Sequence, residues 1–200
     1  MSERDIVIVA CGGANIASLR FALERLEAPA EVSSDPDRIR GASHIILPGV
    51  GAALDAMKRL RSSGLDTLIP SLTQPVLGIC LGMQLLHESS EEGPAQCLGI
   101  FPGATVRLTD APGRPVPHMG WNTLDIDRPS PLLEGIGMQE HAYFVHSYAV
   151  PPSAATVASC RYGAVFSACV ARRNFYGVQF HPERSAAAGA RVLRNFIGLH

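Results

Sequence analysis

The sequence predicts an α/β protein with a central, mostly parallel sheet flanked by helices and a smaller antiparallel region. Short apolar runs alternate with helical stretches in the first half, and the second half is richer in strands and turns. Strands alternating with helices at this spacing are typical of a parallel sheet covered on both faces. Because no repeat and no Gly/Ser-rich linker divides the chain, residues 1–200 are expected to form one domain.

Strands and helices are expected to alternate four times in the first half. Ile6–Ala10 is β-branched and continuously apolar, which is typical of a strand buried on both faces. Asn15 is expected to cap the helix that follows, and Pro29 to end it. Three more strands are expected, at Ala30–Val32, His44–Leu47 and Pro75–Ile79. The remaining helices are expected at residues 35–41, 52–60 and 81–89.

The second half is expected to contain more strands, some of them paired as hairpins. They are placed at Thr105–Leu108, Tyr143–Val145, Thr156–Cys160, Val165–Ala171 and Phe175–Phe180. A closing helix from Ser185 to Ile197 carries apolar residues on one face. Residues 110–115 combine two prolines with a glycine and are the segment most expected to form a long loop.

Composition narrows the class of protein. Seventeen basic and eighteen acidic side chains give a net charge of −1, so neither a nucleic acid nor an anionic membrane is expected as partner. No segment has the pattern of a signal peptide or the roughly 18 apolar residues of a membrane helix. The five cysteines are scattered without a Cys-x-x-Cys pair, which argues against zinc. We therefore expect a cytoplasmic protein with reduced thiols and no bound metal.

Cys80 is the candidate nucleophile. Gly78-Ile79-Cys80-Leu81-Gly82 places it in a tight turn between the end of a strand and the start of a helix, as in a nucleophile elbow. The free N–H groups at the start of a helix favour a thiolate and can hold an oxyanion. The alternative is that Cys80 is a small buried hydrophobic residue, like most free cysteines.

His181 and Glu183 are the candidate partners of that thiol. His181 follows a predicted strand that would end at the same edge of the sheet, and Glu183 lies two residues further on. A carboxylate bonded to one ring nitrogen would set the tautomer and leave the other nitrogen facing Cys80. Alone, a His-Pro-Glu tripeptide favours a polar loop, but its combination with a cysteine elbow is much rarer.

Together, Gly-Ile-Cys-Leu-Gly-Met-Gln and the distant Phe-His-Pro-Glu resemble the triad (class I) glutamine amidotransferases. These enzymes hydrolyse the side-chain amide of glutamine and pass ammonia to a synthase. The resemblance implies a three-layer α/β fold. It also implies that Cys80 is the nucleophile, His181 the general base and acid, and Glu183 the residue that orients His181.

Further segments are similar to signatures of one branch, the glutaminase subunits of imidazole glycerol phosphate synthases. They are Leu47–Gly51, Pro117–Asn122, Tyr143–Tyr148 and Gly177–Ser185, and the likeness runs from about Asn15 to Phe196. The chain departs from that branch at Ala10, where an aspartate is usual, and at Arg184, where lysine is usual. The first departure leaves no role for the usual carboxylate, and the adjacent Cys11 is expected to fill the core.

The resemblance also implies the remaining site residues and the partner. The backbone N–H groups of Val50 and Leu81 would form the oxyanion hole, and no metal or organic cofactor would be required. Glutamine would be held by Gly51, Gln84, Glu92, Ser147 and Tyr148. The partner would be a (β/α)₈-barrel cyclase subunit, through which ammonia passes to make imidazole glycerol phosphate and AICAR in histidine biosynthesis.

Several alternatives remain open on the sequence alone. Glu92 is equally consistent with a solvated acid in the run that begins at Glu88, and Trp121 with a core residue instead of an interface aromatic. The whole chain could serve another amidotransferase pathway, such as anthranilate or aminodeoxychorismate synthesis. Two other classes are a cysteine hydrolase of peptides and a non-enzymatic interaction subunit.

Overall fold

An eight-stranded sheet forms the centre of the protein. The computed structural model describes residues 4–11 and 16–200. The strand order is β2-β1-β3-β4-β14-β13-β12-β9, and the strands that run from β2 to β14 are parallel while the rest are antiparallel. In that order they span Ala30–Ser33, Ile6–Val9, His44–Leu47, Val76–Ile79, Phe175–Val178, Ala164–Arg172, Thr156–Tyr162 and Asp125–Ile126.

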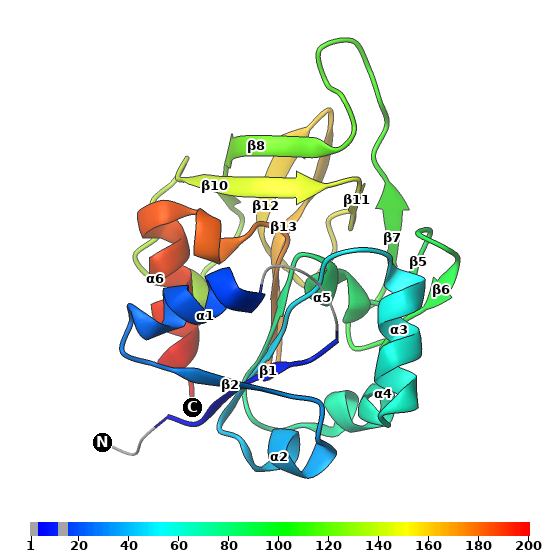
Figure 1. The fold of residues 1–200 in the computed structure, drawn as a ribbon. Coiled ribbons are helices and arrows are strands. Elements are labelled where there is room, and N and C mark those ends of the chain that lie inside the picture. Colours follow the sequence, from blue (N-terminus) through cyan, green and yellow to red (C-terminus); the bar gives the residue numbers. More distant parts are fainter. Residues whose placement is uncertain (1–3, 12–15) are drawn as a thin grey trace.

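Helices cover both faces of this sheet (Figure 1). Helices α1 (Ile16–Glu24) and α6 (Ala186–Ile197) pack on one face, and α2 (Pro36–Gly41), α3 (Ala53–Ser62) and α4 (Leu65–Leu68) pack on the other. Strand β1 shows why its sequence is continuously apolar: Ile6 and Ile8 face the first layer while Val7 and Val9 face the second. The predicted mixed α/β architecture is confirmed. No helix in the described ranges is long and apolar enough to cross a membrane.

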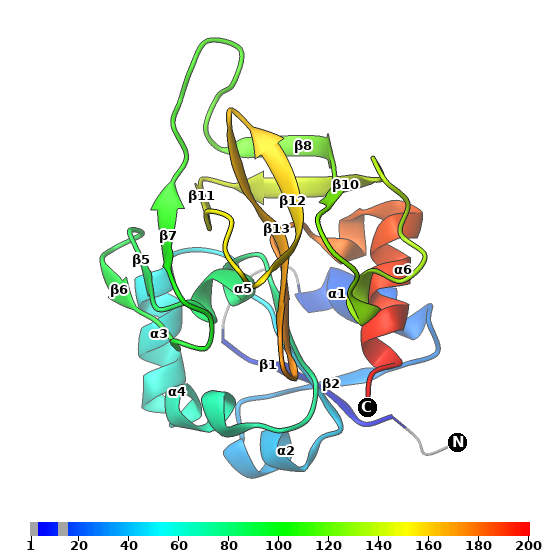
Figure 2. The same ribbon diagram turned by 180° about the vertical axis from the view of Figure 1, so that it is seen from behind.

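Two smaller sheets stand beside the carboxyl ends of the parallel strands, and Figure 2 shows them from behind. One pairs β8 (His118–Thr123) with β10 (His141–His146) in antiparallel fashion. The other contains β11 (Tyr148–Ala149), β7 (Ala104–Arg107), β5 (Ser89–Ser90) and β6 (Ala95–Gln96). Short 3₁₀ helices complete the described elements: η1 (Ile69–Ser71), η2 (Pro131–Leu133) and η3 (Pro182–Arg184).

The predicted elements differ from the structure in a few places. Strand β8 was not predicted, and neither were the two-residue strands β5, β6, β9 and β11. The expected loop at residues 110–115 lies in the long connection between β7 and β8 (Figure 1). The predicted cap Asn15 lies outside the described residues.

The helix after Cys80 is shorter than predicted. It was expected to reach Ser89, but α5 spans only Leu81–Leu85. The carbonyl of Leu85 accepts from the Leu98 N–H, and the carbonyl of Leu86 accepts from Ile100 and Phe101. Bonds to a returning segment thus use the acceptors that a longer helix would need, and the chain turns into β5.

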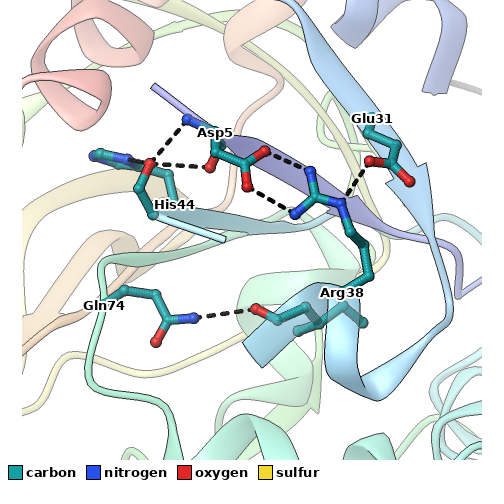
Figure 3. A network of polar contacts seen from close by, with 7 residues as sticks. Asp5, Glu31, Arg38, His44 and Gln74 are labelled. Carbon is teal, nitrogen blue, oxygen red and sulfur yellow. Dashed lines mark hydrogen bonds and ion pairs between the residues drawn. The ribbon is translucent and has the colours of Figure 1, made fainter. Parts of the chain in front are cut away.

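Arg38 joins α2 to two strands of the sheet (Figure 3). Its guanidinium donates through both terminal nitrogens to the carboxylate of Asp5, with Nη1 at 2.7 Å from Oδ2, and through Nε to Glu31 Oε2 at 2.6 Å. Asp5 precedes β1 and Glu31 lies in β2, the edge strand. The Arg38 side chain therefore fixes α2 both to the residue just before β1 and to the edge strand β2.

Gly82 lets α5 lie directly against the end of β3. A Cβ added at this position would lie 1.8 Å from the carbonyl oxygen of Leu47. Replacing Gly82 with alanine is therefore expected to lower the free energy of unfolding by roughly 1–3 kcal/mol or more, because backbone must move to relieve the overlap. Urea unfolding would measure this change. Gly41→Ala is the matched control, since nothing lies within 4 Å of the added atom. Equal midpoints for the two variants would contradict the prediction.

Candidate active site

Cys80 occupies a sharp turn between β4 and α5. Its backbone has φ 53° and ψ −110°, a conformation that L residues rarely adopt and that costs about 1–3 kcal/mol. The turn is held because the Cys80 N–H donates to the carbonyl of Val178 in the neighbouring strand β14 at 2.8 Å. The predicted placement of Cys80 between strand and helix is confirmed. With only five residues, α5 offers the thiol a smaller dipole than the longer helix would have given.

His181 and Glu183 lie next to one another at the end of β14. His181 Nδ1 is 2.9 Å from Glu183 Oε1, and both side chains are buried, with 9% and 3% of their surface exposed. The His181 N–H donates to the carbonyl of Tyr143, and the hydroxyl of Ser185 donates to the carbonyl of His181. These bonds fix the backbone on both sides of the ring, so the tripeptide is not a loose polar loop.

The side chain of Cys80 lies close enough to the ring of His181 to act on its protonation. Burial alone would lower the pKa of His181, but the hydrogen bonds and charges of Cys80 and Glu183 together raise it to about 10. A raised pKa means that the ring of His181 holds its proton near neutral pH. The arrangement is that of a cysteine beside a histidine, with a carboxylate behind the ring.

A cleft of about 450 Å³ opens over Cys80. It is lined by every predicted site residue except Glu183, which lies behind His181. The walls come from segments far apart in the sequence, namely residues 50–52, 80–84, 145–148 and 181, with Glu92 and Pro117. Glutamine, the substrate expected from the sequence, is small enough for a cleft of this size.

Glu92 differs from its acidic neighbours. Whereas Glu88 and Glu91 are exposed, Glu92 is half-buried and its Oε2 accepts from the N–H of Ala53 in the first turn of α3 at 3.2 Å. Burial raises the pKa of its carboxyl group, an effect that the bond from Ala53 partly offsets. The alternative of a freely solvated acid is therefore wrong, and the carboxylate lies in the cleft wall.

The loop before α3 approaches α5 closely. A Cβ added to Gly49 would lie 2.9 Å from Leu81 Cβ, and Gly51 has φ +93°. Glycine is thus required at position 49 by packing and favoured at position 51 by backbone conformation. The thiol of Cys11 donates to the carbonyl of Pro48 at 2.9 Å. Cys11 is buried in the core, as predicted, and also anchors this loop.

Two buried histidines form a neutral pair beside the cleft. His146 Nδ1 donates to the carbonyl of Tyr148 at 2.8 Å, and its Nε2 accepts from His118 Nδ1 at 3.0 Å. Burial lowers the pKa of His118 to about 4 and, with the charges of His118 and His181, lowers that of His146 to about 3. The described residues contain no group of three metal-ligating side chains. Both histidines are satisfied by other groups of the protein, and His146 is also part of the cleft wall.

Gln179 is part of the site but was not among the predicted residues. It is fully buried and its Nε2 lies 3.7 Å from Cys80 Sγ. A signal for it exists in the sequence, since a glutamine between Val178 and Phe180 interrupts an otherwise apolar strand. A buried amide needs a specific partner, and the neighbouring strand end supplies the thiol.

The family is decided by comparison of the sequence with known families. Residues 9–199 match the model of the family described as glutamine amidotransferase class-I. The chain belongs to this family. The amidotransferase identity agrees with the cysteine, histidine and glutamate that the fold brings together.

Individual relatives of this class-I glutamine amidotransferase support the same family assignment. The chain is 53% identical over 193 residues to the imidazole glycerol phosphate synthase subunit HisH of Xanthomonas euvesicatoria pv. vesicatoria, covering 96% of each protein. It is 48% identical over 210 residues to the HisH subunit of Shewanella loihica, covering 100% of this chain and 93% of the other. A crystal structure of a glutamine amidotransferase from Thermotoga maritima shares the fold at a TM-score of 0.68 and 16% identity, over 96% of this chain and 81% of that one.

Proposed function

We propose that this chain is the glutaminase subunit of an imidazole glycerol phosphate synthase. It hydrolyses glutamine to glutamate and ammonia and delivers the ammonia to a cyclase that makes imidazole glycerol phosphate and AICAR in histidine biosynthesis. The observation that carries the proposal is the Cys80–His181–Glu183 arrangement at the floor of the cleft, in a chain 53% identical to a HisH subunit. Five free cysteines fit the reducing cytoplasm as its location.

The reaction proceeds through a thioester. The Cys80 sulfur attacks the side-chain amide carbon of glutamine, and the N–H groups of Val50 and Leu81 hold the resulting oxyanion. His181 gives its proton to the leaving nitrogen, so ammonia departs and a γ-glutamyl thioester remains on Cys80. His181 then takes a proton from water, and the hydroxide attacks the thioester carbon. The carbon–sulfur bond breaks, glutamate leaves, and His181 returns its proton to the Cys80 sulfur. Glu183 keeps the ring of His181 in orientation throughout.

The polar groups around the cleft bind the two ends of glutamine. The carboxylate of Glu92 suits the α-ammonium group, and backbone N–H groups suit the α-carboxylate. Gly51, Gln84 and the backbone at Ser147-Tyr148 complete this binding site in the proposal.

The cyclase partner is a (β/α)₈ barrel that docks on the β8–β10 sheet. Met119 and Trp121 are exposed on β8, by 63% and 54%. Since Trp121 lies on the surface, the alternative that it is a core residue is wrong. Its ring packs edge-on against Tyr143, over which the Arg184 guanidinium lies at 4.3 Å. Exposed aromatic and arginine side chains of this kind are favoured at protein interfaces.

The proposal predicts that the chain alone is a poor glutaminase that its partner stimulates. A peptide plane between Gly49 and Gly51 can turn its N–H toward or away from the oxyanion, and a partner ligand can bias that choice. Typical couplings of this kind correspond to roughly 5–150-fold. Glutaminase rates would be measured for the chain alone, with the cyclase from the same source, and with cyclase and its ligand. Three equal rates would show that the partner does not control the orientation of this peptide.

The same rate measurements, extended to other synthase subunits and to peptide substrates, separate the alternative functions. Activity stimulated by an anthranilate or aminodeoxychorismate synthase subunit instead of the cyclase would assign the chain to another pathway. Absence of glutamine hydrolysis in all three conditions would indicate a non-enzymatic interaction subunit. Cleavage of peptides in place of glutamine would indicate a cysteine hydrolase.

A further inference from the structure

A chain of side-chain amides connects the wall of the cleft to the sulfur of Cys80. Gln84 Nε2 donates to the carbonyl of Tyr148 at 2.9 Å and to Gln179 Oε1 at 3.0 Å. Gln179 in turn directs its Nε2 at Cys80 Sγ, 3.7 Å away. Both glutamines are buried, and Gln179 has no exposed surface. Each amide in this relay therefore depends on the next one for its hydrogen bonds.

The backbone carbonyl of Tyr148 fixes the direction of the relay. A carbonyl oxygen only accepts, and this one also receives the Nδ1–H of His146 at 2.8 Å. Gln84 must therefore present its NH₂ group to Tyr148, and its second hydrogen then points at Gln179 Oε1. With its oxygen committed to Gln84, Gln179 has only its NH₂ group left to present to the sulfur.

The groups around Sγ show whether the Gln179 amide favours the neutral thiol or the thiolate of Cys80. The Cys80 thiol donates to the carbonyl of Val145 at 3.7 Å, and the ring of His181 lies beside the sulfur. The other titratable groups near it are Glu183 behind His181, the neutral His146, and Glu92 across the cleft. A neutral thiol is a weak acceptor, so it leaves a buried amide hydrogen poorly satisfied, whereas a thiolate accepts strongly.

We infer that Gln179 is a further catalytic residue, whose side-chain amide donates to the Cys80 thiolate and keeps the sulfur ionised for attack. The inference rests on the proposed function, in which Cys80 is the nucleophile. Gln179 complements the short helix α5, because it brings an N–H dipole to the sulfur from the end of the neighbouring strand β14. Gln84 and the Tyr148 carbonyl act on the sulfur only through the orientation that they impose on Gln179.

Two substitutions test the donor. Gln179→Met keeps the size of the side chain and removes the amide, and Gln179→Glu keeps an acceptor for Gln84 while turning a carboxylate oxygen toward the sulfur. The second-order rate of Cys80 alkylation by iodoacetamide at neutral pH, with mass mapping of the label, should fall roughly tenfold for Gln179→Met. It should fall further for Gln179→Glu. In the presence of the cyclase, Gln179→Glu should lower kcat with KM near that of the parent.

Gln74→Glu is the matched control. This half-buried glutamine donates through Nε2 to the carbonyl of Ile39 at 3.1 Å, next to the Arg38 network and on a different part of the sheet (Figure 3). The control makes the same change of charge and removes a similar bond, so its alkylation rate should equal that of the parent. Parent-like rates in folded Gln179→Met and Gln179→Glu would overturn the inference. A parent that is alkylated at Cys80 but fails to hydrolyse glutamine with its cyclase would refute the proposed function instead.

The parent protein supplies a measurement that does not depend on the stability of a variant. The side-chain ¹H–¹⁵N amide signals of Gln179 should shift when Cys80 is alkylated, since the acceptor sulfur loses its charge. The side-chain signals of Gln74 should stay in place. An unmoved Gln179 signal would overturn the inference on its own.

Discussion

Replacing Cys80 with alanine is expected to abolish glutamine hydrolysis, with a loss of roughly 10⁴-fold or more. The cleft has one thiol at its floor, and the other cysteines are buried in the core. Burial raises the pKa of Cys11 and Cys97 to about 11 and that of Cys160 to about 12, so none of them supplies a thiolate near neutral pH. Steady-state glutaminase activity with the cyclase present is the measurement.

The fold should survive this change. Cys80→Ser keeps a hydroxyl donor for the carbonyl of Val145, and thermal unfolding of both variants should resemble that of the parent. A glutamine analogue carrying a diazo ketone or chloro ketone should label Cys80 alone. Near-parent hydrolysis by Cys80→Ala, or mapping of the label to another cysteine, would count against the mechanism.

His181→Ala is expected to lower the glutaminase rate by roughly 10³-fold or more, because the proton for the leaving ammonia and the base for water are both lost. The variant retains the oxyanion-hole N–H groups, which leaves some catalysis over the uncatalysed reaction. Steady-state rates with the cyclase present would be compared with those of His200→Ala, whose side chain is exposed after α6, outside the β8–β10 sheet, and does not line the cleft. A control as damaged as His181→Ala would mean that the loss is not specific to the site.

Glu183→Gln is expected to cost less than His181→Ala. The carboxylate is one of the groups that raise the pKa of His181, after Cys80, so its removal lowers that pKa from about 10. The ring then releases its proton at a lower pH, and the alkaline limb of the pH–rate profile should move toward neutrality. Kinetics that made Glu183→Gln as damaging as His181→Ala would mean that the carboxylate does more than orient the ring.

The parallel half of the fold could be predicted from the sequence because its strands are buried on both faces. The apolar residues of β1, β3 and β4 each pack against one of the two helical layers, so these strands can be found in the sequence as apolar runs. Strand β8 has no such continuous apolar run in its sequence. Met119 and Trp121 are apolar but exposed, and the buried ring of His118 is satisfied by His146 and Asn122.

The outline of the site was predictable for a similar reason, while its details were not. Parallel strands end at one edge, so the residues after β4 and β14 had to meet, and Cys80 and His181 do so. The relay through Gln84 and Gln179 depends on a carbonyl of β11, a two-residue strand with no periodic pattern. Likewise the early end of α5 is set by residues 98–101, which no local pattern assigns to it.

The two edge strands of the central sheet are short and charged, which disfavours strand pairing with another molecule. An edge strand exposes unpaired N–H and C=O groups, which can recruit a strand from another molecule. At one edge, β2 is four residues long and carries Glu31, whose carboxylate is held by Arg38. At the other edge, β9 has two residues, one of them Asp125. A second copy approaching β2 would have to desolvate a fixed ion pair, and one approaching β9 would find too few groups to pair with. The sheet therefore ends at both sides within a single molecule.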